Sequence, residues 1–130
     1  MKKRILVIDD EKDNASVFRI ALVNFTGLYE VNSFTNPISA LSSFKSNTYD
    51  LAILDIRMPK INGYELYEKM KNIDDKIKVC FLTAFGEGYH EEFKKRFQAP
   101  GADSLSAAHV HFLRKPITTN DLVEKVKGII

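Results

Sequence analysis

Three aspartates follow short apolar runs and could act together in metal or phosphate chemistry. Asp9 and Asp10 follow the run from 5 to 8, and Asp55 follows the run from 51 to 54. If these runs are neighbouring parallel strands, their ends bring the three carboxylates to one edge of a sheet. Clustered carboxylates repel one another unless a positive charge lies between them, and hard oxygen ligands suit Mg²⁺. The first hypothesis is a metal or phosphate site.

Two further polar groups follow apolar runs in the same way. Thr83 comes after the run that ends at 82, and Lys115 comes shortly after the run from 110 to 113. Since Mg²⁺ binds a few carboxylates and keeps several waters, Asp10 and Asp55 could ligate it directly, and Asp9 could help through a water. These groups predict a site on one rim of the sheet.

The chemistry open to such a site is transfer of a phosphoryl group to a carboxylate. A carboxylate can attack phosphorus and become an aspartyl phosphate, and Asp55 is the predicted nucleophile. Positioning and neutralisation of charge carry most of such a reaction. Lys115 and Thr83 fit the roles of cation and hydroxyl donor.

Alternating strands and helices must position these residues. Short apolar runs rich in β-branched residues predict buried strands at 4–8, 51–54, 77–82 and 110–113, and the alternating run 29–34 predicts a strand nearer an edge. Helical patterns lie between the strands, at 12–25, 37–45, 64–72, 88–98 and 118–130. Asn36 before Pro37 is a predicted N-cap, and Thr118-Thr119-Asn120-Asp121 is a capping-box-like start for the last helix.

This order predicts an α/β fold, a doubly wound (βα)5 three-layer sandwich around a five-stranded parallel sheet. In such sheets ligands bind at the carboxyl ends of the strands, beside the point where strand order reverses, and that is where the aspartates fall. The 130 residues are interpreted as one domain, 1–130, with a lengthened loop at about 99–109 before the last strand.

Composition excludes few partners. The 19 Lys and Arg residues exceed the 17 Asp and Glu residues by only two, which is too little to indicate nucleic acid or an anionic membrane as the main partner. Cys80 is the only cysteine and lies in an apolar run, so an internal disulfide is excluded and a buried thiol is expected. The N-terminal basic residues precede too few apolar residues for a signal peptide, and a cytoplasmic protein is expected.

Four motifs, in order along the whole chain, give the sequence a family resemblance. They are Asp9-Asp10, Asp55 within Asp-x-x-Met-Pro-x-x-x-Gly, Thr83-Ala84 and Lys115-Pro116, each at the end of a predicted strand. With these motifs the chain resembles a response-regulator receiver domain of two-component signalling, as in chemotaxis-regulator-like single domains. The resemblance implies the flavodoxin-like strand order 2-1-3-4-5.

The resemblance also implies roles for single residues. Asp9, Asp10, Asp55 and the backbone carbonyl of Arg57 would hold Mg²⁺, with Mn²⁺ as a possible substitute. Thr83, Lys115 and the backbone of Ala84 would contact the phosphoryl oxygens, and Phe112 would be an aromatic switch that turns inward with Thr83. Phe85 and Arg57 would border the path of the hydrolytic water and give a long-lived phosphorylated form.

The implied function is a phosphoprotein switch that catalyses its own phosphorylation at Asp55 and its slow dephosphorylation. The phosphoryl group would come from a sensor histidine kinase or a histidine phosphotransfer protein. The downstream protein would bind the face made by the fourth helix, the fifth strand and the last helix. Neither a membrane nor direct contact with nucleic acid is implied.

Other interpretations remain open from the sequence. The chain could be a small Mg²⁺-dependent phosphatase or phosphotransferase that uses the same aspartate, or the receiver part of a longer DNA-binding regulator. At single positions, Asp9-Asp10 could simply cap a helix, Phe112 could be a core residue, and the alternating His109 and His111 could bind a transition metal.

Overall fold

The computed structural model describes residues 2–27, 29–83 and 109–130. Its sheet has five parallel strands in the order β2-β1-β3-β4-β5, which confirms the predicted fold and strand order. The strands are β1 (Lys3–Ile8), β2 (Tyr29–Phe34), β3 (Leu51–Asp55), β4 (Lys78–Thr83) and β5 (Val110–Arg114). The helix expected at 88–98, the lengthened loop up to 108, Ala84 and Phe85 lie outside the described residues.

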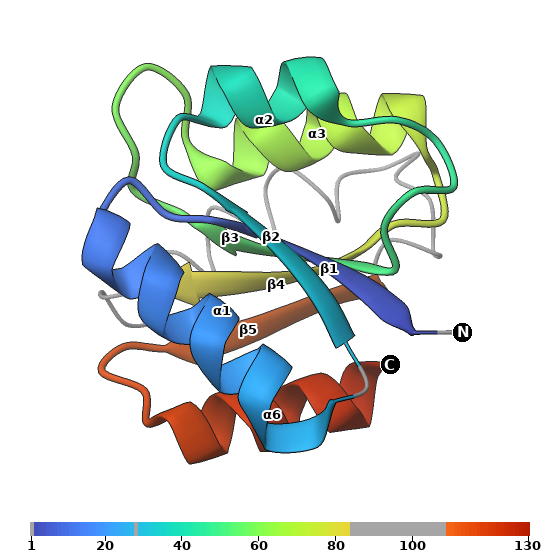
Figure 1. Ribbon diagram of the computed structural model, residues 1–130. Helices are drawn as coiled ribbons and strands as arrows, with labels where there is room; N and C mark the ends of the chain where they lie inside the picture. The colour runs from blue at the N-terminus through green and yellow to red at the C-terminus, as the bar shows by residue number, and fades with distance from the viewer. Residues whose placement is uncertain (1, 28, 84–108) are drawn as a thin grey trace.

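Helices cover both faces of this sheet (Figure 1). The helices α2 (Pro37–Ser43) and α3 (Gly63–Ile73) lie on one face, and α1 (Lys12–Thr26) and α6 (Thr119–Ile129) lie on the other. Each face has its own buried apolar cluster, because neighbouring residues of a strand point to opposite sides. The three-layer arrangement therefore leaves the strand ends, rather than the faces, open to ligands.

Side-chain caps fix where three of the helices begin. The side chain of Asn36 accepts hydrogen bonds from the backbone N–H groups of Ile38 and Ser39, and Thr118 accepts one from Asp121, as predicted. Asn62 and Glu65 form a capping box at the start of α3, which the sequence analysis did not identify. Asp9-Asp10 does not cap α1, whose N-cap is Glu11 without a side-chain capping bond.

Most element boundaries differ by one or two residues from those expected, as helix and strand ends commonly do. The difference matters for β3 and β4, which each end one residue later than expected. Asp55 and Thr83 are therefore the last residues of these strands, and they pair with residues of the neighbouring strands. Their backbones are held by the sheet ladder. The second helix ends at Ser43 instead of 45.

Buried side chains confirm the interpretation of the apolar runs. Cys80 is fully buried in β4, as expected. In α6, Leu122 and Val126 are fully buried, whereas Ile130 lies beyond the helix and is only partly buried. In the part of the chain that the structure describes, no helix combines the length and the apolar character needed to span a bilayer.

Candidate phosphoacceptor and metal site

Three carboxylates meet at the carboxyl ends of β1 and β3. Oxygens of Asp9, Asp10 and Asp55 all lie within 4.8 Å of one another, and within the described residues they are the only three acidic, histidine or cysteine side chains grouped in this way. Asp9 is fully buried, Asp55 is 7% exposed and Asp10 is exposed. Hard oxygen donors at this spacing fit a small divalent cation such as Mg²⁺.

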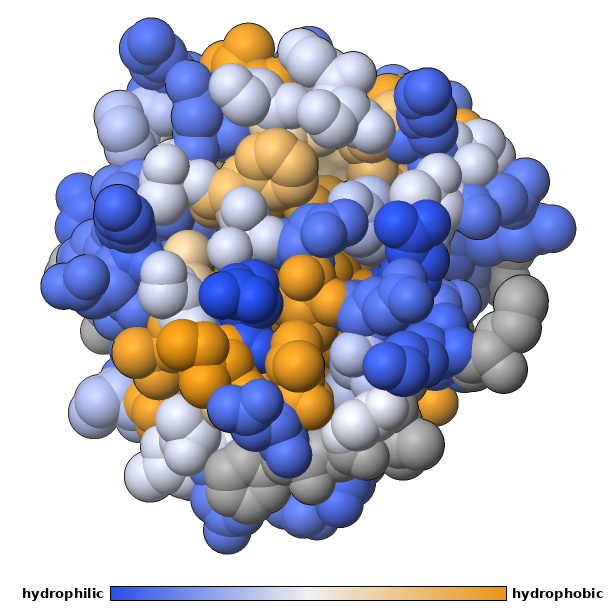
Figure 2. Space-filling view, viewed as in Figure 1, coloured by the Kyte–Doolittle hydropathy of each residue, from blue (hydrophilic) through white to orange (hydrophobic). Residues whose placement is uncertain are grey.

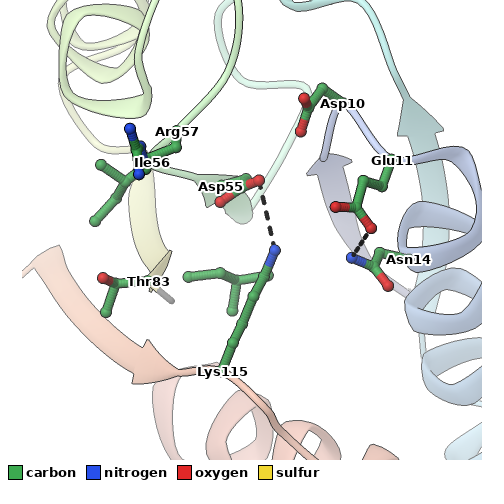
Figure 3. A pocket seen from close by; sticks show the side chains of 9 residues that line it. Asp10, Glu11, Asn14, Asp55, Ile56, Arg57, Thr83 and Lys115 are labelled. Atoms are coloured by element: carbon green, nitrogen blue, oxygen red, sulfur yellow. Dashed lines mark hydrogen bonds and ion pairs between the residues drawn. The ribbon is translucent and has the colours of Figure 1, made fainter. Parts of the chain in front are cut away.

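Lys115 reaches this cluster from the far end of the chain. Its Nζ lies 3.2 Å from Asp9 Oδ2 and 3.4 Å from Asp55 Oδ2, and Figure 3 shows its side chain extended toward Asp55. The backbone N–H of Lys115 donates a hydrogen bond to the carbonyl oxygen of Thr83 at 2.7 Å, so the end of β4 holds the backbone of Lys115 in place. One ammonium group therefore neutralises parts of two carboxylates.

The surroundings of Asp55 disfavour its charge. Burial raises the pKa of Asp55 to about 6; the ammonium of Lys115 opposes this shift, while the charges of Asp9 and Asp10 add to it. For Lys115, burial alone would lower the pKa, but the charges of Asp55 and Asp9 outweigh it and the pKa is raised. The cluster thus holds more negative charge than one lysine balances, and a bound cation would reduce the repulsion between the carboxylates.

The loop after β3 folds tightly back on Asp55. The Gly63 N–H donates to the carbonyl oxygen of Ile56 at 2.9 Å, and a Cβ on Gly63 would lie only 2.6 Å from the backbone oxygen of Asp55. Only glycine allows this approach without a shift of the backbone. The Gly at the end of the Asp-x-x-Met-Pro-x-x-x-Gly motif therefore closes the loop that carries Arg57, whose carbonyl remains a predicted ligand.

These groups line a pocket of about 220 Å³ (Figure 3). The pocket brings together five of the residues predicted to form the site, which are Asp10, Asp55, Arg57, Thr83 and Lys115. Two further polar residues line it, the α1 N-cap residue Glu11 and Asn14 in the first turn of α1, and neither was predicted from the sequence. Their signal was present, since Glu11 directly follows the acidic pair and Asn14 lies three residues further on the same helix.

Phe112 lies on the same face of the sheet as Thr83. Its ring centroid is 5.5 Å from that of Phe81, its register partner on β4, and it packs at the edge of the cluster under α2 and α3. Phe112 is only partly buried, which leaves its role as a switch a prediction. His111 lies on the opposite face, and burial lowers its pKa.

A comparison with known protein families matches residues 5–127 to the response regulator receiver domain. The chain belongs to the response regulator receiver family. The match includes residues from all five strands of the sheet, and it favours the receiver interpretation over that of a small metabolic phosphatase.

Curated relatives of this receiver differ in length. The chain is 29% identical to the response regulator receiver protein CpdR of Brucella abortus over 98% of its own length and 97% of CpdR. It is 28% identical to the response regulator SaeR of Staphylococcus aureus over 97% of its own length but only 50% of SaeR. The chain thus spans nearly all of one relative and half of the other.

Solved receiver structures share the fold. A CheY-like receiver domain of Methanospirillum hungatei superposes with a TM-score of 0.77 at 28% identity, covering 98% of this chain and 93% of that one. The response regulator TrrA of Thermotoga maritima, in complex with Mg²⁺ and BeF, has a TM-score of 0.73 at 31% identity over 98% and 99% of the two chains. TrrA in complex with the histidine kinase ThkA has a TM-score of 0.72 at 32% identity over 98% of each chain.

Proposed function

We propose that Asp55 is the phosphoacceptor and that it takes a phosphoryl group from the phosphohistidine of a sensor histidine kinase or a histidine phosphotransfer protein. The observation that carries this proposal is the position of Asp55: its carboxylate lines the pocket, beside two other carboxylates and in contact with Lys115. TrrA, a structural relative, has been solved with a histidine kinase.

Each group has a proposed part in the transfer. An oxygen of Asp55 forms a bond to phosphorus as the bond from phosphorus to the histidine nitrogen breaks, and the nitrogen keeps the electron pair. The ammonium of Lys115 can move from Asp55 to the arriving phosphoryl oxygens. Thr83 lines the same pocket and is the proposed hydroxyl donor to them. The backbone of Ala84 is proposed as a further contact.

The proposed cofactor is Mg²⁺, with Mn²⁺ as a substitute, and its proposed ligands are Asp10, Asp55 and the Arg57 carbonyl, with Asp9 acting through a water. Bound in this way, the ion would neutralise charge on the phosphoryl oxygens and relieve repulsion between the carboxylates. The compact group of three carboxylates supports this proposal, as does the Mg²⁺ and BeF complex of TrrA.

The proposed docking side for the kinase is the surface of α1 next to the pocket. Val17 and Ile20 of α1 are each 48% exposed, and Figure 2 shows hydrophobic side chains gathered over this helix. A mainly apolar groove of about 430 Å³ runs from Val17 and Phe18 to Lys115 and Ile117. A helical partner that covered this groove would bring its phosphohistidine to the mouth of the pocket.

Phosphorylation in solution tests the assignment of Asp55. Incubation with phosphoramidate and Mg²⁺ should add one phosphoryl group to the wild type, detected by intact mass, and none to Asp55→Asn. The exposed Asp75, in the loop before β4, offers a matched control in Asp75→Asn, which should be labelled like the wild type. Labelling of Asp55→Asn, or labelling that continues in EDTA, would contradict the proposal.

We further propose that residues 1–130 act as one receiver domain in the cytoplasm and signal to a protein partner. The face proposed for that partner includes β5 and α6 on the described side. The part of it expected from 88–98 and the loop near 99–109 lies outside the described residues, except for His109.

A further inference from the structure

A fourth carboxylate lines the pocket and has no part in the chemistry above. Glu11 lies on the wall formed by the start of α1, and its Oε2 accepts a hydrogen bond from Asn14 Nδ2 at 3.1 Å (Figure 3). Glu11 is the N-cap residue of α1, yet its side chain makes no capping hydrogen bond. Asn14 therefore holds this carboxylate on the pocket wall.

The charge of Glu11 is not balanced within the described part of the chain. Lys115 contacts Asp9 and Asp55, whereas neither Asp10 nor Glu11 has an ion-pair partner among the described residues. Asp10 already has a role as a proposed direct ligand of the cation. Glu11 is thus the one acidic side chain of the pocket whose presence the proposed chemistry leaves unexplained.

The position of Glu11 fits an interaction with the ion through water rather than direct coordination. The carboxylates whose oxygens lie within 4.8 Å of one another are Asp9, Asp10 and Asp55, and Glu11 is outside this group. Mg²⁺ keeps several of its waters when it binds a few carboxylates, and hydrogen bonds to such outer groups tune metal affinity. A carboxylate on the pocket wall can accept hydrogen bonds from such waters.

We propose that Glu11, oriented by Asn14, is a positioning residue that accepts hydrogen bonds from the water shell of the bound divalent cation. The inference rests on the proposed function of the pocket, and it assigns to this chain a carboxylate beyond the acidic pair. Glu11 raises the affinity for Mg²⁺ without contacting the ion. Asn14 contributes by restricting the rotamers of Glu11, so the Glu11 side chain loses less conformational entropy when it binds the water shell.

Mg²⁺ titration of the unphosphorylated protein tests this proposal, followed by the amide NMR signals of residues 55–57. Glu11→Gln keeps the shape of the side chain and removes its charge, and should weaken Mg²⁺ binding about three- to tenfold. Asn14→Ala should weaken it about two- to threefold, because the charge remains but its orientation is lost. Well-dispersed spectra before addition of Mg²⁺ show that each variant is folded.

Asp13→Asn is the matched control, since Asp13 is an exposed acidic residue in the first turn of the same helix and does not line the pocket. In about 1 M KCl, charges more than about 3 Å apart are screened, so Asp13→Asn should have no effect. Glu11→Gln should keep the part of its loss that comes from hydrogen bonds to the water shell, because these contacts are short enough to escape screening. Equal losses for both variants, wild-type affinity for Glu11→Gln, or wild-type affinity for Asn14→Ala would overturn the proposal. A wild type that binds no Mg²⁺ would instead overturn the proposed function.

Discussion

Asp55 is unfavourable for folding as a charged group and is the residue that we propose as the phosphoacceptor. Its carboxylate is buried next to two others, and its pKa is raised to about 6 from the usual 3.8. The ionised form, which a phosphoacceptor needs for attack, is therefore the form that the folded protein disfavours. Such strain is typical of active sites, where a ligand restores the balance.

We predict that Asp55→Asn stabilises the Mg²⁺-free protein at pH 7.5. A folded-state pKa above the unfolded value means that the stability contributed by this carboxyl is present below about pH 4 and is lost as the pH rises through about 6. A shift of one pKa unit corresponds to about 1.4 kcal/mol, so the free energy of unfolding of Asp55→Asn should exceed that of the wild type by at most about 3 kcal/mol. Thermal melts between pH 4 and 8 measure it.

The expected pattern is a higher melting point for Asp55→Asn at pH 7.5 and a difference that shrinks toward pH 4. Asp75→Asn serves again as the control, with no change at either pH. Equal melting points at pH 7.5 would show that Lys115 compensates the charge of Asp55 fully. A difference that is independent of pH would show that the ionisation of Asp55 is not its cause.

Arg57 is predicted to prolong the phosphorylated state. Its exposed side chain lines the pocket two residues after Asp55, where a bulky cation can cover the phosphoryl group and shield it from water. Arg57→Asn should shorten the lifetime of the phosphorylated protein by roughly two- to tenfold, in keeping with loss of one charge-assisted contact. Intact mass after removal of the phosphodonor follows the decay.

Lys60→Asn is a suitable control for this loss of a cation. Lys60 is in the same loop, is exposed and does not line the pocket, and its φ of 73° is one that asparagine accepts well. A wild-type lifetime for Arg57→Asn, or equal changes in both variants, would assign control of water access to another group. Phe85, expected at the same path, lies outside the described residues.

At the scale of the element, the loop between β3 and α3 depends on one close approach. Gly63 is buried, and its nearest neighbour is backbone that cannot move aside as a flexible side chain would. The capping box of Asn62 and Glu65 then starts the helix at once. The loop is thus tied to the strand end that presents Asp55.

We predict that Gly63→Ala lowers the free energy of unfolding by about 1 to 3 kcal/mol, because the added methyl group must push the β3 backbone or the loop aside. It should also weaken Mg²⁺ binding, since the Arg57 carbonyl moves with the loop. Gly128→Ala in α6 is the matched control, with nothing within 4 Å of the added Cβ. Helix propensity makes that control neutral or more stable by up to about 1 kcal/mol.

Urea denaturation and Mg²⁺ titration of both glycine variants check this prediction. If Gly63→Ala and Gly128→Ala have the same midpoint and Mg²⁺ affinity, the loop adapts without cost. A loss of stability with unchanged affinity would separate the fold of the loop from the position of the carbonyl.

At the scale of the whole molecule, the site and the proposed output face are joined through β4 and β5. Thr83 ends β4 in the pocket, and Phe112 on β5 packs against Phe81 on the same side of the sheet. A ligand shifts a conformational equilibrium only by its differential affinity for the two states. A charge-assisted hydrogen bond of about 1.5 to 3 kcal/mol from Thr83 to a phosphoryl group is enough to shift such a balance substantially.

We predict that Mg²⁺ and beryllofluoride together change amide hydrogen exchange in β5 and at the start of α6, as well as around the pocket. Thr83→Ala should keep the changes next to Asp55 and lose those in β5, because the hydroxyl is the proposed link. Hydrogen exchange with mass spectrometry measures both proteins. Changes confined to α1 and α2, with peptides across residues 84–115 unaltered, would disprove this output face.

The amino-acid sequence by itself determined the order of the described strands and helices and the strand ends near which the aspartates, Thr83 and Lys115 lie. It could do so because buried parallel strands are short apolar runs and because parallel strands place their carboxyl ends on one edge. Asn36 and Thr118 were likewise readable as caps, since a cap is a local hydrogen bond within a few residues.

Only the tertiary structure decided which carboxylates Lys115 contacts and how far Asp55 is buried. Residues 106 positions apart, Asp9 and Lys115, meet through the sheet, and no local pattern encodes their 3.2 Å contact. The raised pKa of Asp55 depends on what surrounds it from several strands, and the need for glycine at Gly63 depends on the backbone of another element. Glu11 is similar: sequence suggests a helix start, whereas packing places its carboxylate on the wall of the pocket.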